Sequence, residues 1–200
     1  MLPLPTIAGF VFAALVATGA SASTPGNPAP DFTINDAAGK PVRLSEYKGK
    51  FVVLEWTNPE CPFVQKHYNS GNMQGLQKAY AGRDVVWLSI NSTRREHSEF
   101  KSGSEMSKWM SEHAAAPKAV LIDATSTAGR AYTARTTPQM FVVDPAGRIV
   151  YAGAIDDKRS TNLDDVKTAK NYVRAALDES MAGKPVTIAS TRPYGCSVKY

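Results

Sequence analysis

The chain has 200 residues, 43% of them hydrophobic and 20% charged, which suits one globular domain with a single sizeable core. Its formal net charge is +5, but the basic residues are scattered, and no basic stripe is interleaved with aromatic side chains. This pattern argues against a nucleic-acid-binding protein. Cys61 and Cys196 are the two cysteines of the chain, and what they mean depends on the compartment.

The N-terminus indicates export. Residues 7–20 are uncharged and mostly apolar, and Ala20-Ser21-Ala22 has the small-x-small pattern of a signal-peptidase site. The run is shorter than the roughly 20 residues of a membrane span, although residues 1–6 lack the usual Lys or Arg. We expect a signal peptide over residues 1–22, cleaved after Ala22, with an uncleaved anchor as the alternative. The mature form would then be periplasmic or secreted and free of the membrane, where two cysteines can form a lasting disulfide.

The next segments predict a short flexible stretch and then a β-hairpin. Residues 23–30 are rich in Pro, Gly and Ser, which favours a flexible lead-in. Residues 31–34 and 42–44 alternate polar and apolar side chains around a turn-rich stretch at 36–40. We place the folded domain at residues 31–183 and a C-terminal tail carrying Cys196 at residues 184–200.

Strands and helices alternate through the rest of the domain. This order predicts an α/β sheet covered on both faces, with ligand chemistry at the carboxyl ends of its parallel strands. The predicted strands are residues 51–56, 85–90, 119–122, 140–143 and 149–153; the predicted helices are residues 63–80 with a break at 69–71, 105–116, 125–133 and 162–181.

Cys61 lies just past the end of the first of these buried strands. Asn58-Pro59 forms a turn, and Pro62 suits the first position of a helix, which makes Cys61 the predicted N-cap. Backbone N–H groups of Phe63 or Val64 and the helix dipole would then favour the thiolate, which is the nucleophilic form. The alternative is a small apolar residue that only packs at the helix start.

Several motifs resemble the thioredoxin superfamily, and most of all its alkyl hydroperoxide reductase / thiol-specific antioxidant group, the peroxiredoxin-like proteins. The resemblance spans about residues 29–156. It rests on Ala29-Pro30-Asp31-Phe32, Gly39-Lys40, Leu44, Lys48-Gly49-Lys50, Val52-Val53-Leu54 and a cysteine at a helix start. It implies a three-layer thioredoxin-like fold with a central mixed sheet flanked by helices, to which the N-terminal hairpin is an extension. It also implies a cis-proline at Thr137-Pro138 beside Cys61, with Trp56, Thr57, Thr137 and Pro138 contacting substrate; Trp56 could instead belong to the core.

Two departures from the family pattern limit the chemistry that we expect. Thioredoxins carry Cys-x-x-Cys, whereas Val64 takes the second position here. Peroxiredoxins carry a Thr three residues before the cysteine, where this chain has Asn58, and an Arg where this chain has Pro138, with Arg135 near but not aligned. Fast peroxidase chemistry is therefore in doubt, while thiol chemistry is not.

Cys196 is the second sulfur available to Cys61. About 13 residues separate it from Gly183, and at about 3.3 Å each they span roughly 40 Å, so the tail can return to Cys61. We expect Cys61 to attack a protein disulfide or a small peroxide and Cys196 to resolve the product, with an external reductant and no cofactor or metal. A static Cys61–Cys196 disulfide that pins the tail is the alternative.

Two other classes of function stay open. A copper-binding chaperone would use soft thiolates for Cu(I), but the local second cysteine is missing. A structural or partner-binding domain would keep the fold without catalysis. His67 comes six residues after Cys61 and is expected to point away from the sulfur, as a surface or partly buried histidine.

Overall fold

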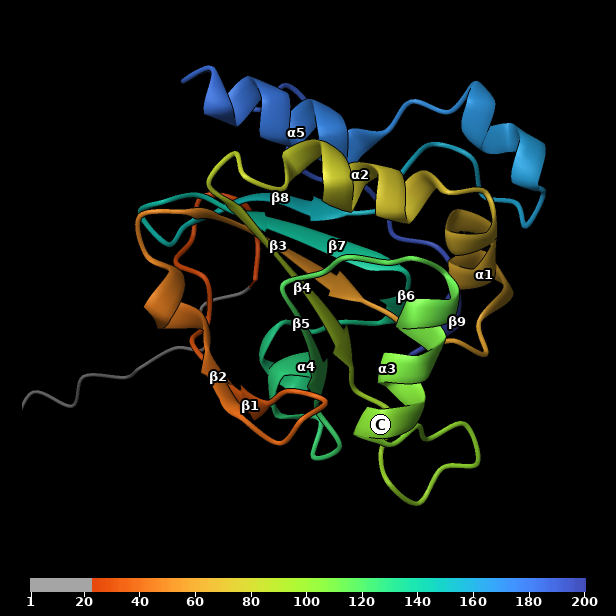
Figure 1. Cartoon of the computed structure of the whole chain (residues 1–200). Coiled ribbons are helices and arrows are strands. Elements are labelled where there is room, and N and C mark those ends of the chain that lie inside the picture. The colour runs from red at the N-terminus through yellow and green to blue at the C-terminus, as the bar shows by residue number, and fades with distance from the viewer. Residues whose placement is uncertain (1–22) are drawn as a thin grey trace, which may run out of the picture.

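A five-stranded mixed sheet forms the centre of the computed structural model, which describes residues 23–200 (Figure 1). The predicted signal peptide lies outside the described residues. The strand order is β5-β4-β3-β7-β8: β3, β4 and β5 run parallel, and β7 and β8 are each antiparallel to the preceding neighbour. The strands are β3 (Phe51–Trp56), β4 (Val85–Asn91), β5 (Ala119–Ile122), β7 (Gln139–Val143) and β8 (Ile149–Gly153).

Helices cover both faces of this sheet, so the predicted three-layer α/β fold is confirmed. The helices are α1 (Pro62–Asn69), α2 (Asn72–Tyr80), α3 (Gly103–Glu112), α4 (Thr127–Ala131) and α5 (Tyr172–Met181). Side chains of α1, α2, α3 and α5 share one buried cluster with Val53. α4 packs on the other face together with the predicted hairpin of β1 (Thr33–Asn35) and β2 (Pro41–Arg43).

The alternation of side chains along β3 assigns each of its residues to one of these two cores. Val52, Leu54 and Trp56 face the hairpin and α4, while Val53 joins the cluster that contains Cys61. Successive side chains of a strand point to opposite faces, so Glu55 lies on the Cys61 side. The first buried strand therefore contributes side chains to both cores, and the short segment 57–61 connects it to α1.

Two predictions fail at the periphery. The helix expected over residues 162–181 is a 3₁₀ turn at Leu163–Lys167 followed by α5, because Asn171 caps a new helix by accepting from the Arg174 N–H at 2.9 Å. The Tyr172 N–H donates to Ile155 instead of continuing the earlier turn. Leu163, expected in the apolar stripe, is exposed.

The segment 23–30, expected to be flexible, is instead hydrogen-bonded to the start of β8. Gly26 N–H donates to the Ile149 carbonyl at 2.8 Å, and the Ile149 N–H donates to Asn27 at 2.9 Å. Turn-forming residues here shape a bonded loop, because backbone groups near a strand edge find partners there.

The tail returns across the domain to the start of α1. Ser190 pairs with Ala152 of β8, and residues further along the tail form β9 (Cys196–Ser197), which is antiparallel to β6 (Thr136–Thr137). Among residues 23–200, the helices are all too short or too polar to span a membrane.

Candidate active site around Cys61 and Cys196

Cys61 is the N-cap of α1, as the sequence predicts. Its backbone is extended, Pro62 follows at the first helical position, and its carbonyl accepts the Gln65 N–H at 2.9 Å. The expected sulfur cap is wrong, however. The Sγ atom donates to the Thr137 carbonyl oxygen at 3.0 Å instead of receiving N–H groups of the helix. Only 1% of the residue is exposed.

Thr137 and Pro138 form the wall opposite Cys61. Their peptide bond is cis, as the family resemblance implies, and the Thr137 carbonyl accepts the hydrogen bond of the Cys61 thiol. Both residues are buried and lead into β7, the neighbour of β3 in the sheet. The wall and the cysteine are therefore held by two adjacent strands.

Cys196 is brought to Thr137 by the C-terminal tail. In the β6–β9 pair, Cys196 is the direct partner of Thr137, whose carbonyl accepts from Cys61. Both cysteines are free thiols, and Cys196 is partly buried. Burial and the adjoining Cys61 thiol raise the pKa of Cys196 well above its ordinary value. The tail thus brings the second sulfur into the neighbourhood of the first.

Gly195 permits this close approach. Its φ of 138° is unfavourable for other residues, and a Cβ placed on it would lie 1.9 Å from the Thr137 carbonyl oxygen. A side chain at this position would push β9 off β6. Glycine is therefore required where the tail crosses the cis-proline segment.

Comparison with known proteins agrees with this geometry. The model of the AhpC/TSA family matches residues 25–152. The chain belongs to the AhpC/TSA family. It is 24% identical over 157 residues, 75% of this chain and 78% of the other, to the thiol-disulfide oxidoreductase ResA of Bacillus subtilis (strain 168).

Two solved structures are also similar to this AhpC/TSA protein. An uncharacterized conserved protein from Geobacillus kaustophilus is 30% identical, with a TM-score of 0.76 over 88% of this chain and 92% of the other. A putative thiol:disulfide interchange protein DsbE from Chlorobium tepidum has a TM-score of 0.53 at 21% identity, over 64% of this chain and 83% of the other, and supports the thioredoxin-like fold. Family and fold together make the chain a thiol-dependent oxidoreductase of thioredoxin-like type.

Asn58 stands where the family pattern has Thr, and Arg135 lies near the position of the family's Arg; in this structure both residues have structural roles. Asn58 accepts the Glu60 N–H at 2.9 Å and donates to Glu99 at 2.9 Å, so it shapes the turn before Cys61. Arg135 is exposed, and its backbone N–H donates to the Gln139 side chain. The hydrogen bond of the Cys61 sulfur goes to the Thr137 carbonyl and not to either of these residues.

Trp56 and Thr57, which the family resemblance places at the substrate, are both buried in the structure. Trp56 is fully buried on the face away from Cys61, where it packs on Tyr132 and Phe141 and donates to Ser92 at 3.0 Å. The alternation of β3 sets this direction, so the core interpretation of Trp56 is correct. Thr57 is 1% exposed, and its N–H continues the β3–β4 ladder by donating to Ile90.

Glu55 is a buried carboxylate that the sequence analysis missed. It accepts from the Tyr68 hydroxyl at 2.7 Å, from the Trp87 indole at 2.7 Å and from the Ser89 hydroxyl at 2.9 Å. Burial raises the pKa of this carboxyl despite the three donors. The signal was a single acid inside the apolar run of residues 51–56.

His67 is fully buried, so the expectation of a surface or partly buried histidine is wrong. Its Nδ1 lies 2.9 Å from the Asn72 amide, and its Nε2 lies 3.2 Å from the Tyr194 hydroxyl. Burial and the neighbouring Lys66 charge lower the pKa of His67 to about 3. Returning tail residues cover this face of α1, which local sequence could not indicate.

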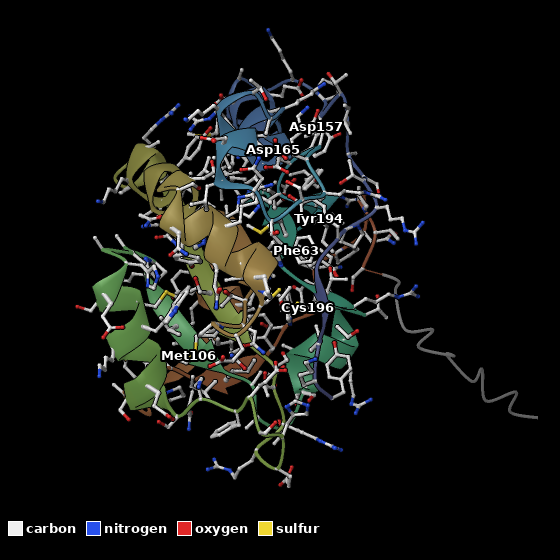
Figure 2. All side chains as sticks on the ribbon, turned by 90° about the vertical axis from the view of Figure 1, so that its right-hand side faces the viewer. Phe63, Met106, Asp157, Asp165, Tyr194 and Cys196 are labelled. Atoms are coloured by element: carbon white, nitrogen blue, oxygen red, sulfur yellow. The ribbon has the colours of Figure 1, made fainter. Side chains whose placement is uncertain are left out.

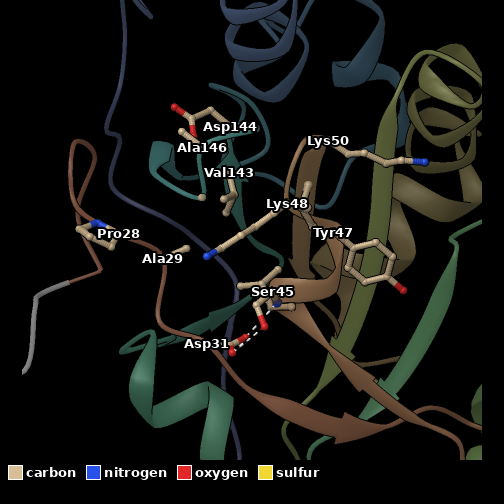
Figure 3. A pocket seen from close by; sticks show the side chains of 13 residues that line it. Pro28, Ala29, Asp31, Ser45, Tyr47, Lys48, Lys50, Val143, Asp144 and Ala146 are labelled. Atoms are coloured by element: carbon tan, nitrogen blue, oxygen red, sulfur yellow. Dashed lines mark hydrogen bonds between the residues drawn. The ribbon is translucent and has the colours of Figure 1, made fainter.

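Sites elsewhere on the described surface lack comparable chemistry. A cavity of about 220 Å³ lies at the far end of β3, beside Lys48, Asp31 and Val143 (Figure 3). Asp31 there is bonded to Ser45. Across residues 23–200, His, Cys, Asp and Glu side chains do not gather in threes as a metal site requires.

Proposed function

We propose that Cys61 and Cys196 are the redox pair of an exported thiol-disulfide oxidoreductase whose partners are proteins carrying a disulfide or dithiol. One observation carries the proposal: Thr137 accepts the hydrogen bond of the Cys61 thiol and is also the strand partner of Cys196. Because the Cys61 sulfur and the backbone of Cys196 both meet Thr137, the two cysteines are neighbours, as a pair that exchanges a disulfide must be. The apolar residues 7–20 and the Ala20-Ser21-Ala22 site support export.

The proposed cycle reduces a partner's disulfide. The Cys61 thiolate attacks one sulfur of that disulfide, forms a mixed disulfide with it, and releases the other sulfur as a thiolate that takes up a proton. The Cys196 thiolate then attacks Cys61 Sγ and releases the second partner thiol. The partner has gained two electrons and two protons, the protein holds a Cys61–Cys196 disulfide, and an external dithiol restores it.

The buried state of Cys61 means that this cycle includes movement of the tail. With 1% exposure, Cys61 cannot meet an outside disulfide while β9 lies on β6. A shift of residues 195–197 would uncover Thr137, Pro138 and Cys61 together. The same shift in reverse would bring Cys196 to the mixed disulfide.

Trapping tests the proposal. Cys196→Ser should accumulate a mixed disulfide with a model protein disulfide, visible by mass spectrometry, whereas Cys61→Ser should form none. Since the chain has no other cysteine, a trapped adduct reports on Cys61 alone. Unchanged thiol-dependent turnover in both variants would refute the proposal.

The reduction potential separates the redox pair from a static clamp. Structural disulfides have potentials below about −300 mV, so a higher value in glutathione titration is expected for a working pair. A peroxide substrate would instead give sulfenate at Cys61 in Cys196→Ser, and failure to trap any disulfide would favour it.

A further inference from the structure

A cluster of buried polar side chains joins the two segments that carry the cysteines. The Tyr194 hydroxyl donates to Asp156 Oδ1 and lies 3.2 Å from His67 Nε2. Asp156 comes from the loop after β8, and its Oδ2 lies 4.0 Å from the same nitrogen. We refer to Tyr194, His67 and Asp156 as the tail latch.

The hydrogen-bond directions in the latch follow from its members. Since the Tyr194 hydroxyl gives its proton to Asp156, it accepts from His67 Nε2–H. His67 Nδ1 then accepts from the Asn72 amide at 2.9 Å. One neutral tautomer of His67 satisfies both contacts. The hydrogen bonds therefore all point the same way, from Asn72 to His67, from His67 to Tyr194 and from Tyr194 to Asp156.

The positions of these residues tie the latch to the sulfurs. His67 belongs to the helix that begins at Cys61, and Tyr194 precedes Cys196 by two residues. Figure 2 shows Tyr194 and Cys196 following one another along the tail, beside Phe63 at the start of α1. Burying a carboxylate, an imidazole and a phenol together is costly unless they are paired, so this arrangement calls for a specific reason.

The contribution of the Tyr194 hydroxyl can be tested apart from that of the ring, because the two make different contacts. The ring packs edge-on against Phe63 with centroids 5.8 Å apart, and the Lys66 ammonium lies 5.8 Å from its centroid. Phenylalanine would keep these contacts and lose only the bonds to Asp156 and His67. Other anchors, such as the Lys199–Glu99 ion pair at 3.5 Å, would still hold the tail near the domain.

We propose that Tyr194 is a positioning residue, whose hydroxyl, held by Asp156 and His67, fixes Cys196 beside Thr137 and the tail over Cys61. This inference rests on the proposed redox pairing of the two cysteines. Fixing the tail raises the effective concentration of Cys196 at Cys61 and so favours the intramolecular disulfide over mixed disulfides. Loss of the hydroxyl loosens residues 194–196 while the rest of the tail stays bound.

The test compares Tyr194→Phe with Tyr80→Phe. Tyr80 is a matched control, because it too is buried and donates to a carboxylate, Asp178 at 2.7 Å, but far along α2 from the sulfurs. Titration with glutathione should show the Cys61–Cys196 disulfide constant lowered by about tenfold in Tyr194→Phe, the worth of one charge-assisted hydrogen bond. Tyr80→Phe should leave that constant unchanged even if its melting temperature falls as much.

A second readout keeps this inference separate from the proposed function. In Cys196→Ser protein, only Cys61 can be alkylated, and adding Tyr194→Phe should raise its alkylation rate several-fold, whereas adding Tyr80→Phe should not. If wild-type protein forms no Cys61–Cys196 disulfide, the proposed function fails, while the alkylation rate still reports whether the latch closes the site. A folded Tyr194→Phe protein with both quantities unchanged would overturn the positioning role.

Discussion

Cys196 and Thr137 are direct partners in the two-stranded pair β6–β9, and the same Thr137 accepts the hydrogen bond of the Cys61 thiol. Thr137, which directly precedes the cis-proline, therefore contacts both segments that carry a cysteine. The site is assembled from three distant parts of the chain, and its closure depends on how tightly the last of them is docked. The predictions below separate docking of the tail from stability of the domain.

Gly195→Ala should open the site. A Cβ there would meet the Thr137 carbonyl at 1.9 Å, and a φ of 138° is strained for alanine, so β9 must move away from β6. We expect faster alkylation of Cys61 at neutral pH, a weaker Cys61–Cys196 disulfide, and a free energy of unfolding lower by about 1–3 kcal/mol. Timed alkylation with mass spectrometry and glutathione titration measure the first two.

Gly147→Ala is the control for backbone strain alone. Gly147 has a φ of 80°, but its added Cβ would meet nothing within 4 Å. We expect a loss of about 1 kcal/mol of stability and an unchanged rate of Cys61 alkylation. Equal alkylation rates in the two variants would show that the tail does not cover the sulfur as described.

Trp56→Phe should cost stability without altering the thiol chemistry. The change removes the hydrogen bond to Ser92 and part of a fully buried ring that packs on Tyr132 and Phe141, for about 2–4 kcal/mol. Because Trp56 faces away from Cys61, the alkylation rate and disulfide constant should match the wild type. Urea unfolding measures the loss of unfolding free energy. A change in the Cys61 alkylation rate or in the disulfide constant would instead show that Trp56 acts on the thiol site.

Periodicity and local motifs predicted the framework because strands and caps are encoded nearby in sequence. The run of residues 51–56 and Pro62 sufficed to place Cys61 at a helix start. The direction of its sulfur was not predictable, since the acceptor is Thr137, which is remote in the sequence. The full burial of His67, predicted to be a surface or partly buried residue, was missed for the same reason: Tyr194, which contacts it, comes from the other end of the chain.

Glu55→Gln should change how stability depends on pH. Burial raises the pKa of the Glu55 carboxyl, so the folded state holds its proton at a pH where the unfolded state has lost it. The associated stability is fully present below the unfolded pKa, near 4.5, and is lost as the pH rises through the folded pKa. Wild-type protein should therefore lose more unfolding free energy than Glu55→Gln between pH 4 and pH 8.

Urea unfolding at several pH values measures the difference for Glu55. Glu96→Gln is the control, because Glu96 is exposed, and its curve should follow the wild type. Parallel stability curves for wild type and Glu55→Gln would mean that the carboxyl is accommodated as a charge by Tyr68, Trp87 and Ser89.

His67→Gln should protect the protein against mild acid. The pKa of His67 is lowered from 6.5 to about 3, so its contribution to stability is present above pH 6.5 and is lost as the pH falls toward 3. At about 1.4 kcal/mol per pH unit, wild-type protein should lose roughly 2–3 kcal/mol between pH 6.5 and pH 4.5 that the variant keeps.

Burial raises the pKa of neighbouring Asp156, which makes stability change with pH in the opposite sense. The comparison is therefore made between variants and not from the wild-type slope alone. His97→Gln, in the loop before α3, serves as the control. If its free energy of unfolding depends on pH in the same way as that of His67→Gln, the buried His67 is not the source of the acid sensitivity.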